Sequence, residues 1–204
     1  MKKAAKSVLC ACSAAAMLVA GQAGAAVLLS DNFDSETRAL NYTGFANWNV
    51  TSGSVDLIGP GLFDLYPGNG NYVDLAGSTN FGGTLTSKQS FSIGPGQSFN
   101  LSFKMGGSAR GTSNVVEVAL GSTILTTLTL PSDTPLSLHS LTNITGPSMS
   151  GFLSFRNVTN GTQGAILDDV LLSSSSVPEP ASAALLALGL GVLMLKRPRR
   201  GRWY

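Results

Sequence analysis

Two adjacent carboxylates, Asp168 and Asp169, interrupt an apolar segment near the end of the chain and form its most conspicuous pair of titratable residues. Successive side chains of a strand point to opposite faces, so the pattern places Asp168 on the same face as Val170 and Leu172, with Asp169 on the other face. At least one carboxylate therefore faces apolar neighbours. A buried, ionised carboxylate needs a partner, and the simplest partners are backbone N–H groups or an arginine.

Catalytic constellations are sparse. His139 is the only histidine, so a Ser–His–Asp triad must use it, and no Gly-x-Ser-x-Gly nucleophile elbow occurs. A zinc site lacks histidine and cysteine ligands. A glycosidase needs two facing carboxylates, whereas Glu36 and Glu117 are far apart in sequence and Asp168 and Asp169 are expected on opposite faces. The sequence therefore predicts no enzyme and no catalytic residue; a divergent glycan hydrolase is the alternative.

Aromatic residues in loops are candidates for ligand binding. Phe63 and Tyr66 lie in the glycine- and proline-rich segment 59–68. Exposed aromatic rings of this kind can stack on sugar rings, and the alternative is that they pack the loop onto the body of the protein. Arg110, in a second glycine-rich loop, is either a ligand contact or a solvated turn residue. Trp48 lies in a strand-like context, which favours a core position over a binding one.

These residues must be positioned by short β-strands. In Ser98–Met105, four apolar residues alternate with four polar ones, which is typical of a strand with one buried face. Similar runs are separated by Gly, Pro, Asn and Ser, and helical periodicity is absent. The pattern predicts an all-β, two-sheet jelly-roll sandwich over residues 27–173. The other predicted strands are Val27–Phe33, Trp48–Val50, Ser54–Ile58, Tyr72–Leu75, Leu85–Ile93, Val115–Leu120, Ile124–Leu130, Leu136–Ile144, Phe152–Val158 and Ala165–Leu172.

The first 26 residues have the pattern of a secretory signal peptide. Three lysines near the start precede the apolar run Val8–Ala20, and small residues at Ala23–Ala26 suit cleavage by signal peptidase. Both cysteines, Cys10 and Cys12, lie in this removable segment. The mature protein is therefore expected to have no disulfide, although it is exported to an oxidising compartment.

The end of the chain predicts a single membrane helix. The run 181–195 carries no charged residue, and at about 1.5 Å per helical residue it covers about 22 Å, a little less than the ~30 Å hydrocarbon core. A buried core helix is the alternative, but the run has no polar face. A basic segment, 196–204, follows at once and is expected to remain in the cytoplasm. Its leading basic residues are Lys196, Arg197, Arg199 and Arg200.

A short motif, Val177-Pro178-Glu179-Pro180, precedes this apolar run within the predicted linker 174–180. Motif, apolar run and basic end together resemble the PEP-CTERM protein-sorting tail, also called the C-terminal domain of ice-binding proteins. The resemblance implies an exosortase-type processing enzyme in the inner membrane as a partner, and release to the cell surface or the extracellular matrix. A permanent membrane anchor is the alternative.

Charge narrows the range of partners for the segment between these two ends. Residues 27–176 contain five basic and ten acidic residues, a formal net charge of −5. Nucleic-acid binding requires a basic surface, so the composition argues against it. An acidic exported domain suits a soluble surface or matrix protein.

The body resembles galactose-binding-domain-like sandwiches, which include many carbohydrate-binding modules. The residues that carry the likeness include Asn32-Phe33-Asp34, Trp48-Asn49-Val50, Tyr72–Gly77, Phe99–Phe103 and Gly164–Val170. The resemblance implies a jelly roll with a glycan ligand. It also implies a structural calcium held by an acid of the last strand and by groups near the first strand. The residues expected to hold it are Asp31, Asp34, Asp168 and Asp169.

Together these features predict an exported, non-catalytic glycan-binding module that is sorted by its tail and associates with extracellular polysaccharide. Phe63, Tyr66 and Arg110 are its expected ligand contacts. A purely structural matrix or surface protein without a small ligand is the alternative from a different class.

Overall fold

The computed structural model describes residues 25–94, 96–146 and 149–176. In these residues the protein is all-β, and no helix long and apolar enough to cross a bilayer occurs among them. The predicted sorting motif, membrane helix and basic tail, and nearly all of the predicted signal peptide, lie outside the described residues. The strands are Ala26–Asp31 (β1), Trp48–Ser52 (β2), Asp56–Ile58 (β3), Tyr72–Asp74 (β4), Thr84–Ile93 (β5), Gln97–Gly106 (β6), Asn114–Leu120 (β7), Thr123–Leu130 (β8), Ser137–Ile144 (β9), Met149–Asn157 (β10) and Ile166–Ser176 (β11).

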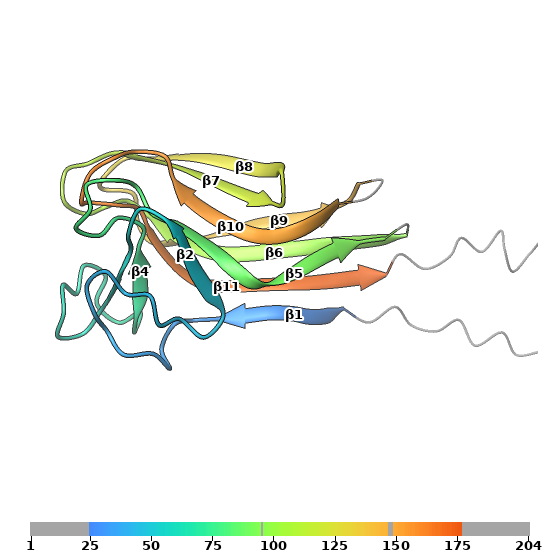
Figure 1. Ribbon diagram of the computed structural model, residues 1–204, viewed down its shortest axis with the longest axis horizontal. Coiled ribbons are helices and arrows are strands. Elements are labelled where there is room, and N and C mark those ends of the chain that lie inside the picture. Colours follow the sequence, from blue (N-terminus) through green and yellow to red (C-terminus); the bar gives the residue numbers. More distant parts are fainter. Residues whose placement is uncertain (1–24, 95, 147–148, 177–204) are drawn as a thin grey trace, which may run out of the picture. The chain divides into compact units, whose positions relative to one another are not determined.

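The strands form two antiparallel sheets, which confirms the predicted sandwich class. The first sheet has the order β3-β4-β11-β6-β9. β1 also pairs with β11, at residues that follow those paired with β4. The second has the order β2-β5-β10-β7-β8. The ribbons of β9, β6, β11 and β1 follow one another across the first sheet (Figure 1). The first and last described strands are therefore direct neighbours, with Ala26 opposite Ser174.

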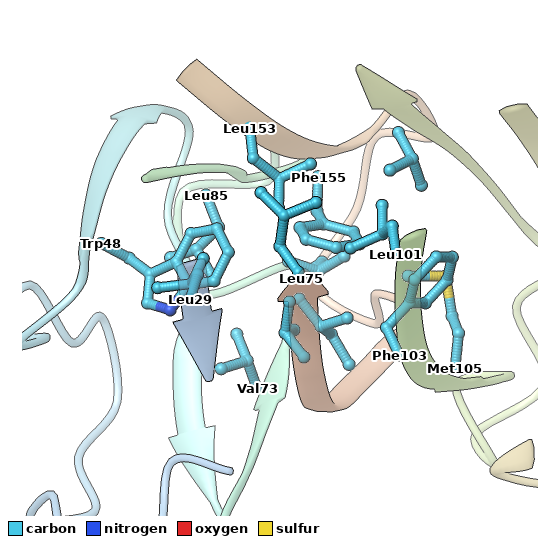
Figure 2. Packing of buried hydrophobic residues seen from close by; sticks show 14 of the residues in the cluster. Leu29, Trp48, Val73, Leu75, Leu85, Leu101, Phe103, Met105, Leu153 and Phe155 are labelled. Carbon is cyan, nitrogen blue, oxygen red and sulfur yellow. The ribbon is translucent and has the colours of Figure 1, made fainter. Parts of the chain in front are cut away.

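The core lies between the sheets and follows the expected alternation. The apolar residues of β6 are at most 2% exposed, and they meet Leu153 and Phe155 from the second sheet (Figure 2). The centroid of the Phe155 ring lies 5.1 Å from that of Phe103 and 5.8 Å from that of Trp48, and both pairs have an edge-to-face arrangement. Trp48 is fully buried, so the prediction of a core position is confirmed.

Several strand boundaries differ from the prediction, and for two of them the hydrogen bonds show the reason. β1 ends at Asp31 because the Asp31 Oδ1 atom accepts the N–H of Phe33 at 2.9 Å, which turns the chain, and Phe33 has φ 58°. β11 runs on to Ser176 because residues 174–176 continue the pairing with β6. This corrects the predicted linker, whose first three residues belong to the sandwich.

A bulge in β11 overturns the predicted alternation at the two aspartates. Asp168 pairs with Lys104 and Leu171 with Ser102, so two residues of β11 oppose one of β6. Asp169, within the bulge, has φ 48°. Asp168 therefore faces outward, away from the core, while Val170 beyond the bulge is buried. The Asp169 carboxylate turns to the outward-facing Lys104, so the prediction that the two aspartates point to opposite faces was wrong.

The segment between β3 and β4 covers part of the outer surface of the first sheet. Its residues Leu62, Leu65 and Tyr66 pack on a small apolar cluster that includes Tyr72 and Ile166. Asn69, from the same segment, accepts a hydrogen bond from Lys104 at 3.4 Å. Outward-facing side chains at the start of β11 are consequently buried beneath a loop.

Candidate functional site

Asp168 is the most unusual polar residue of the described chain, because it faces outward yet is only 1% exposed. Its Oδ1 atom accepts the N–H of Asp169 at 2.7 Å, whereas its Oδ2 atom is buried and has no hydrogen-bond partner among residues 25–94, 96–146 and 149–176. Burial, and after it the neighbouring Asp169 carboxylate, raises the pKa of Asp168 from 3.8 to about 7. The backbone N–H of Asp169 and the Lys104 ammonium oppose this rise. An orphaned carboxylate oxygen is an acceptor for a cation or a donor group.

Asp169 and Lys104 form an ion pair at the edge of this buried carboxylate. Lys104 Nζ lies 2.7 Å from Asp169 Oδ2, and the two side chains are 33% and 43% exposed. The hydrogen bond to Asp169 raises the pKa of the Lys104 ammonium. The charge of Asp168 also contributes to this rise, so two carboxylates lie near one ammonium group.

The other two predicted metal ligands have different environments. Asp34 is exposed, and its Oδ1 atom accepts the backbone N–H of Asn71 at 2.7 Å. Asp31 uses both oxygens as acceptors: Oδ1 for Phe33, and Oδ2 for the Asn47 amide and the Trp48 indole N–H, each at 2.9 Å. Asp31 therefore fastens the end of β1 to the core tryptophan.

These carboxylates meet the requirements of the predicted calcium site only in part. No group of three or more His, Cys, Asp or Glu side chains gathers as a metal cluster among the described residues. Asp168 supplies a buried oxygen that has no hydrogen-bond partner among the described residues, whereas the two oxygens of Asp34 accept hydrogen bonds from Asn71 and Asn32. Calcium also accepts backbone and amide carbonyl oxygens, so two carboxylates suffice as a nucleus. Calcium binding by Asp34 and Asp168 stays a prediction, with Asp169 already paired to Lys104.

The predicted ligand-binding aromatics divide into one exposed and one structural residue. Phe63 is 58% exposed and has φ 49°. Tyr66 is half-buried, and its hydroxyl donates to the carbonyl oxygens of Gly107 and Thr134 at 3.0 and 2.9 Å. Tyr66 thus joins its own loop to two others, which is the packing alternative considered for it.

Arg110 is also held inside the protein. Its guanidinium binds the carboxylate of Asp74, a fully buried residue at the end of β4. The Arg110 Nε–H donates to the carbonyl of Ser108 at 3.3 Å. Arg110 and Tyr66 lie in or against the same glycine-rich loop, so the structure brings these two predicted contacts together, but with their polar groups directed at protein partners.

His139 shows no catalytic arrangement. Its ring stacks on Phe103 at 5.5 Å between centroids, and its Nε2 atom is buried without a hydrogen-bond partner in the described part of the chain. A base that activates a serine must accept a hydrogen bond from it.

A groove of about 630 Å³ crosses the outer surface of the first sheet beside the bulge. Its floor follows a row of paired residues, in which Ser30 of β1 opposes Leu171 of β11, and Leu171 opposes Ser102 of β6. Leu138 of β9 lies diagonally beyond Ser102. The groove thus runs from β9 across β6 and β11 to β1, perpendicular to the strands, and three strand spacings of about 4.8 Å give it a length of roughly 14 Å.

The lining of the groove combines short polar groups with two exposed leucines. Ser30 and Ser35 are exposed, and the Asn32 and Asn47 amides stand at the end nearest β1. Leu138 is 66% and Leu171 39% exposed. Asp169 also lines the groove, and its side chain is 43% exposed. Apolar patches among hydroxyl, amide and carboxylate groups match the surface of a sugar chain, which presents C–H faces and hydroxyl edges.

The sequence arguments missed this groove, although one signal for it exists. Leu138 and Leu141 are three residues apart in β9, so a period of two cannot place both on the core face. Leu141 packs against the core and Leu138 faces outward. The groove residues Ser30, Ser102 and Leu171 lie on three different strands, so only the sheet order brings them together.

No protein-family model and no curated protein matches the sequence, so the PEP-CTERM resemblance rests on the residues of the tail alone. Solved structures with similar backbones share little sequence. One contains the CBM22-1 and GH10 modules of xylanase 10B from Clostridium thermocellum, complexed with xylohexaose: TM-score 0.47, 12% identity, 72% of this chain covered, and only 28% of that chain.

Two other solved structures are covered almost entirely. The Stig cyclase FisC from Fischerella sp. TAU has a TM-score of 0.45 and 15% identity, with 76% of this chain and 100% of that chain covered. The family 11 carbohydrate-binding module of a Clostridium thermocellum cellulase has a TM-score of 0.36 and 13% identity, with 67% of this chain and 93% of that chain covered. Carbohydrate-binding modules and an enzyme thus occur among these neighbours, and likeness at this level decides no function.

Proposed function

We propose that the chain is an exported, non-catalytic β-sandwich of the jelly-roll type that binds extracellular glycan. The observation that carries this proposal is the groove across β9, β6, β11 and β1, with its hydroxyl, amide and carboxylate groups and its exposed leucines. The groove is open and shallow, which suits one side of an extended chain. The alternatives are a structural matrix protein without a ligand and a divergent glycan hydrolase.

The groove takes the binding role that the sequence predicted for Tyr66 and Arg110. Those two residues direct their polar groups at protein partners. Phe63, which is exposed, remains a candidate for a contact outside the groove. Short polar side chains without an aromatic platform predict weak binding of a single chain, which repeated copies on a surface would strengthen by multivalency.

Calcium is proposed as a structural ion held by Asp168 and Asp34. The support is the buried Asp168 Oδ2 atom, which has no hydrogen-bond partner in the part of the chain that the structure describes. A bound divalent cation would neutralise these carboxylates and fix the loop that covers the start of β11.

Export and sorting are proposed from the sequence of the two ends. The proposed processing partners are signal peptidase and an exosortase-type enzyme, with transient residence in the inner membrane. The intact mass of the protein recovered from cell surface and medium tests this: a mass ending near Val177–Pro180 is expected. A mass that includes residues 199–204, found only with membranes, would replace sorting by permanent anchoring.

Binding is tested by calorimetric titration of the full chain with β-1,4-linked hexasaccharides of glucose, xylose and mannose. The expected result is saturable binding of at least one of them. Leu138→Asp, which places a charge on the floor of the groove, should weaken it more than tenfold, whereas Phe152→Asp, at an exposed apolar residue of β10, should not. No binding of any hexasaccharide favours the structural alternative, and release of reducing sugar favours the hydrolase.

A further inference from the structure

The charges around the groove have one sign. Among the described residues, those that line the groove include Asp31 and Asp169 and neither a lysine nor an arginine. Asp31 is buried and both of its oxygens accept hydrogen bonds from the protein, so Asp169, with a side chain that is 43% exposed, is the carboxylate that a ligand can reach. A glycan with uronic acid units would bring its carboxylates against Asp169, and like charges in contact repel.

Lys104 does not reverse this balance. Its ammonium group is 2.7 Å from the Asp169 carboxylate and 3.4 Å from the Asn69 amide oxygen. A carboxylated ligand would have to take this ammonium away from Asp169 and would then leave the Asp169 charge unpaired. Sugar hydroxyl groups, in contrast, can donate to the outer lone pairs of Asp169 while the ion pair stays in place.

The backbone holds Asp169 in this position. The bulge between Asp168 and Leu171 adds a residue to β11, and Asp169 takes φ 48°, a conformation that asparagine and aspartate adopt more readily than other non-glycine residues. The N–H of Asp169 is bound by the Asp168 carboxylate at 2.7 Å. A hydrogen-bond acceptor is therefore preorganised beside the row Ser30, Leu171 and Ser102.

We infer that the groove selects uncharged, hydroxyl-bearing glycan chains against carboxylated ones, and that Asp169 is the residue that determines this specificity. The inference rests on the proposed glycan-binding function and adds the chemical class of its ligand. Asp169 accepts hydrogen bonds from hydroxyl groups of the neutral chain and repels the carboxylate of an acidic chain.

The test uses two pairs of probes with the same backbone and length. Cellohexaose is compared with its C6-oxidised β-1,4-glucuronic acid hexamer, and β-1,4-mannohexaose with the β-1,4-mannuronic acid hexamer. Titration of the full chain at low salt should give dissociation constants at least tenfold lower for the neutral member of a pair that binds. Raising the ionic strength should reduce this ratio, because added salt screens repulsion between exposed charges.

Two variants locate the source of the preference. Asp169→Asn keeps a residue that tolerates positive φ and removes the charge, so the ratio within a pair should fall below threefold. Glu117→Gln removes one negative charge from β7 on the other sheet, and it should leave the ratio unchanged. Equal melting temperatures of both variants and the wild type exclude a loss of fold as the cause.

The outcomes separate this inference from the proposed function. Equal binding of both members of a pair, or a preference that survives Asp169→Asn, overturns the inference and leaves glycan binding in place. Tighter binding of the acidic member also overturns it. If none of the four hexamers and no other neutral hexasaccharide binds, the proposed function fails and the inference fails with it.

Discussion

Two buried aspartates on the neighbouring strands β4 and β11 show how differently one side chain can be used. Asp74, at the end of β4, is fully buried, and each of its oxygens has a partner. Its Oδ1 atom accepts the N–H groups of Ala76 and Gly164 at 3.0 and 2.8 Å, and its Oδ2 atom binds the Arg110 guanidinium. Asp168 is about as deeply buried, but one of its oxygens has no hydrogen-bond partner within the described residues.

The difference distinguishes Asp74, which stabilises the fold, from Asp168, which belongs to a candidate site. Burial raises the pKa of both carboxyl groups, and at Asp74 the Arg110 guanidinium is the strongest opposing effect. Asp74 links the chain after β4, the turn before β11 and the loop that contains Arg110. Such contacts are typical of a structural residue. Asp168 instead has a buried oxygen that lacks a hydrogen-bond partner among the described residues, and such a group needs an explanation.

The largest expected effect on stability comes from replacing Asp74, whose two carboxylate oxygens both have hydrogen-bond partners. Asp74→Ala leaves the Arg110 guanidinium and two backbone N–H groups without their acceptor, and loss of one partner from a buried ion pair costs about 3–5 kcal/mol. Urea denaturation should show this as a lower midpoint. The matched control is Arg156→Ala, which removes a mostly exposed ion pair with Glu117 and should cost less than about 1 kcal/mol. Equal losses in the two variants would contradict the structural role of Asp74.

A smaller effect is expected at the unsatisfied aspartate, and it should depend on calcium. Asp168→Asn removes a buried charge next to Asp169, so in chelator the variant should be at least as stable as the wild type. Calcium at a hundredfold excess over its dissociation constant should stabilise the wild type by about 2.7 kcal/mol and raise its melting temperature by several degrees.

The same calcium addition should leave the melting temperature of Asp168→Asn unchanged. Differential scanning calorimetry in calcium and in chelator measures both proteins. Identical wild-type melts in the two conditions would remove the proposed ion and reduce Asp168 to a strained structural residue.

The smallest expected effect concerns Tyr66, whose hydroxyl group is satisfied in the way that Asp74 is. Tyr66→Phe keeps the ring on Tyr72 and Ile166 but removes the single O–H donor that two backbone carbonyl oxygens share, at a cost of about 1–2 kcal/mol. Glycan affinity should not change, because the hydroxyl group is directed away from solvent. A loss of binding without a loss of stability would restore Tyr66 as a ligand contact.

Most of the strands could be predicted from the sequence because alternation with a period of two is a local property. In β6 and β7 every second residue is buried, as the pattern indicates. The predicted strand boundaries were wrong where a strand pairs with a segment that is distant in the sequence. β11 continues to Ser176 because β1 and β6 both pair with its end, and a run of serines carries no signal for that.

By itself the sequence determined the all-β class, the core position of Trp48, the acidity of the body and the burial of a carboxylate at residues 168 and 169. Each of these follows from residue types and from neighbours one or two positions away. Only the tertiary structure decided which aspartate is buried and where the other one lies, because a bulge changes the face of every residue beyond it. It also decided that Tyr66 and Arg110 direct polar groups at protein partners and that Ser30, Ser102, Leu138 and Leu171 share a groove, since strand order joins residues that are far apart in the chain.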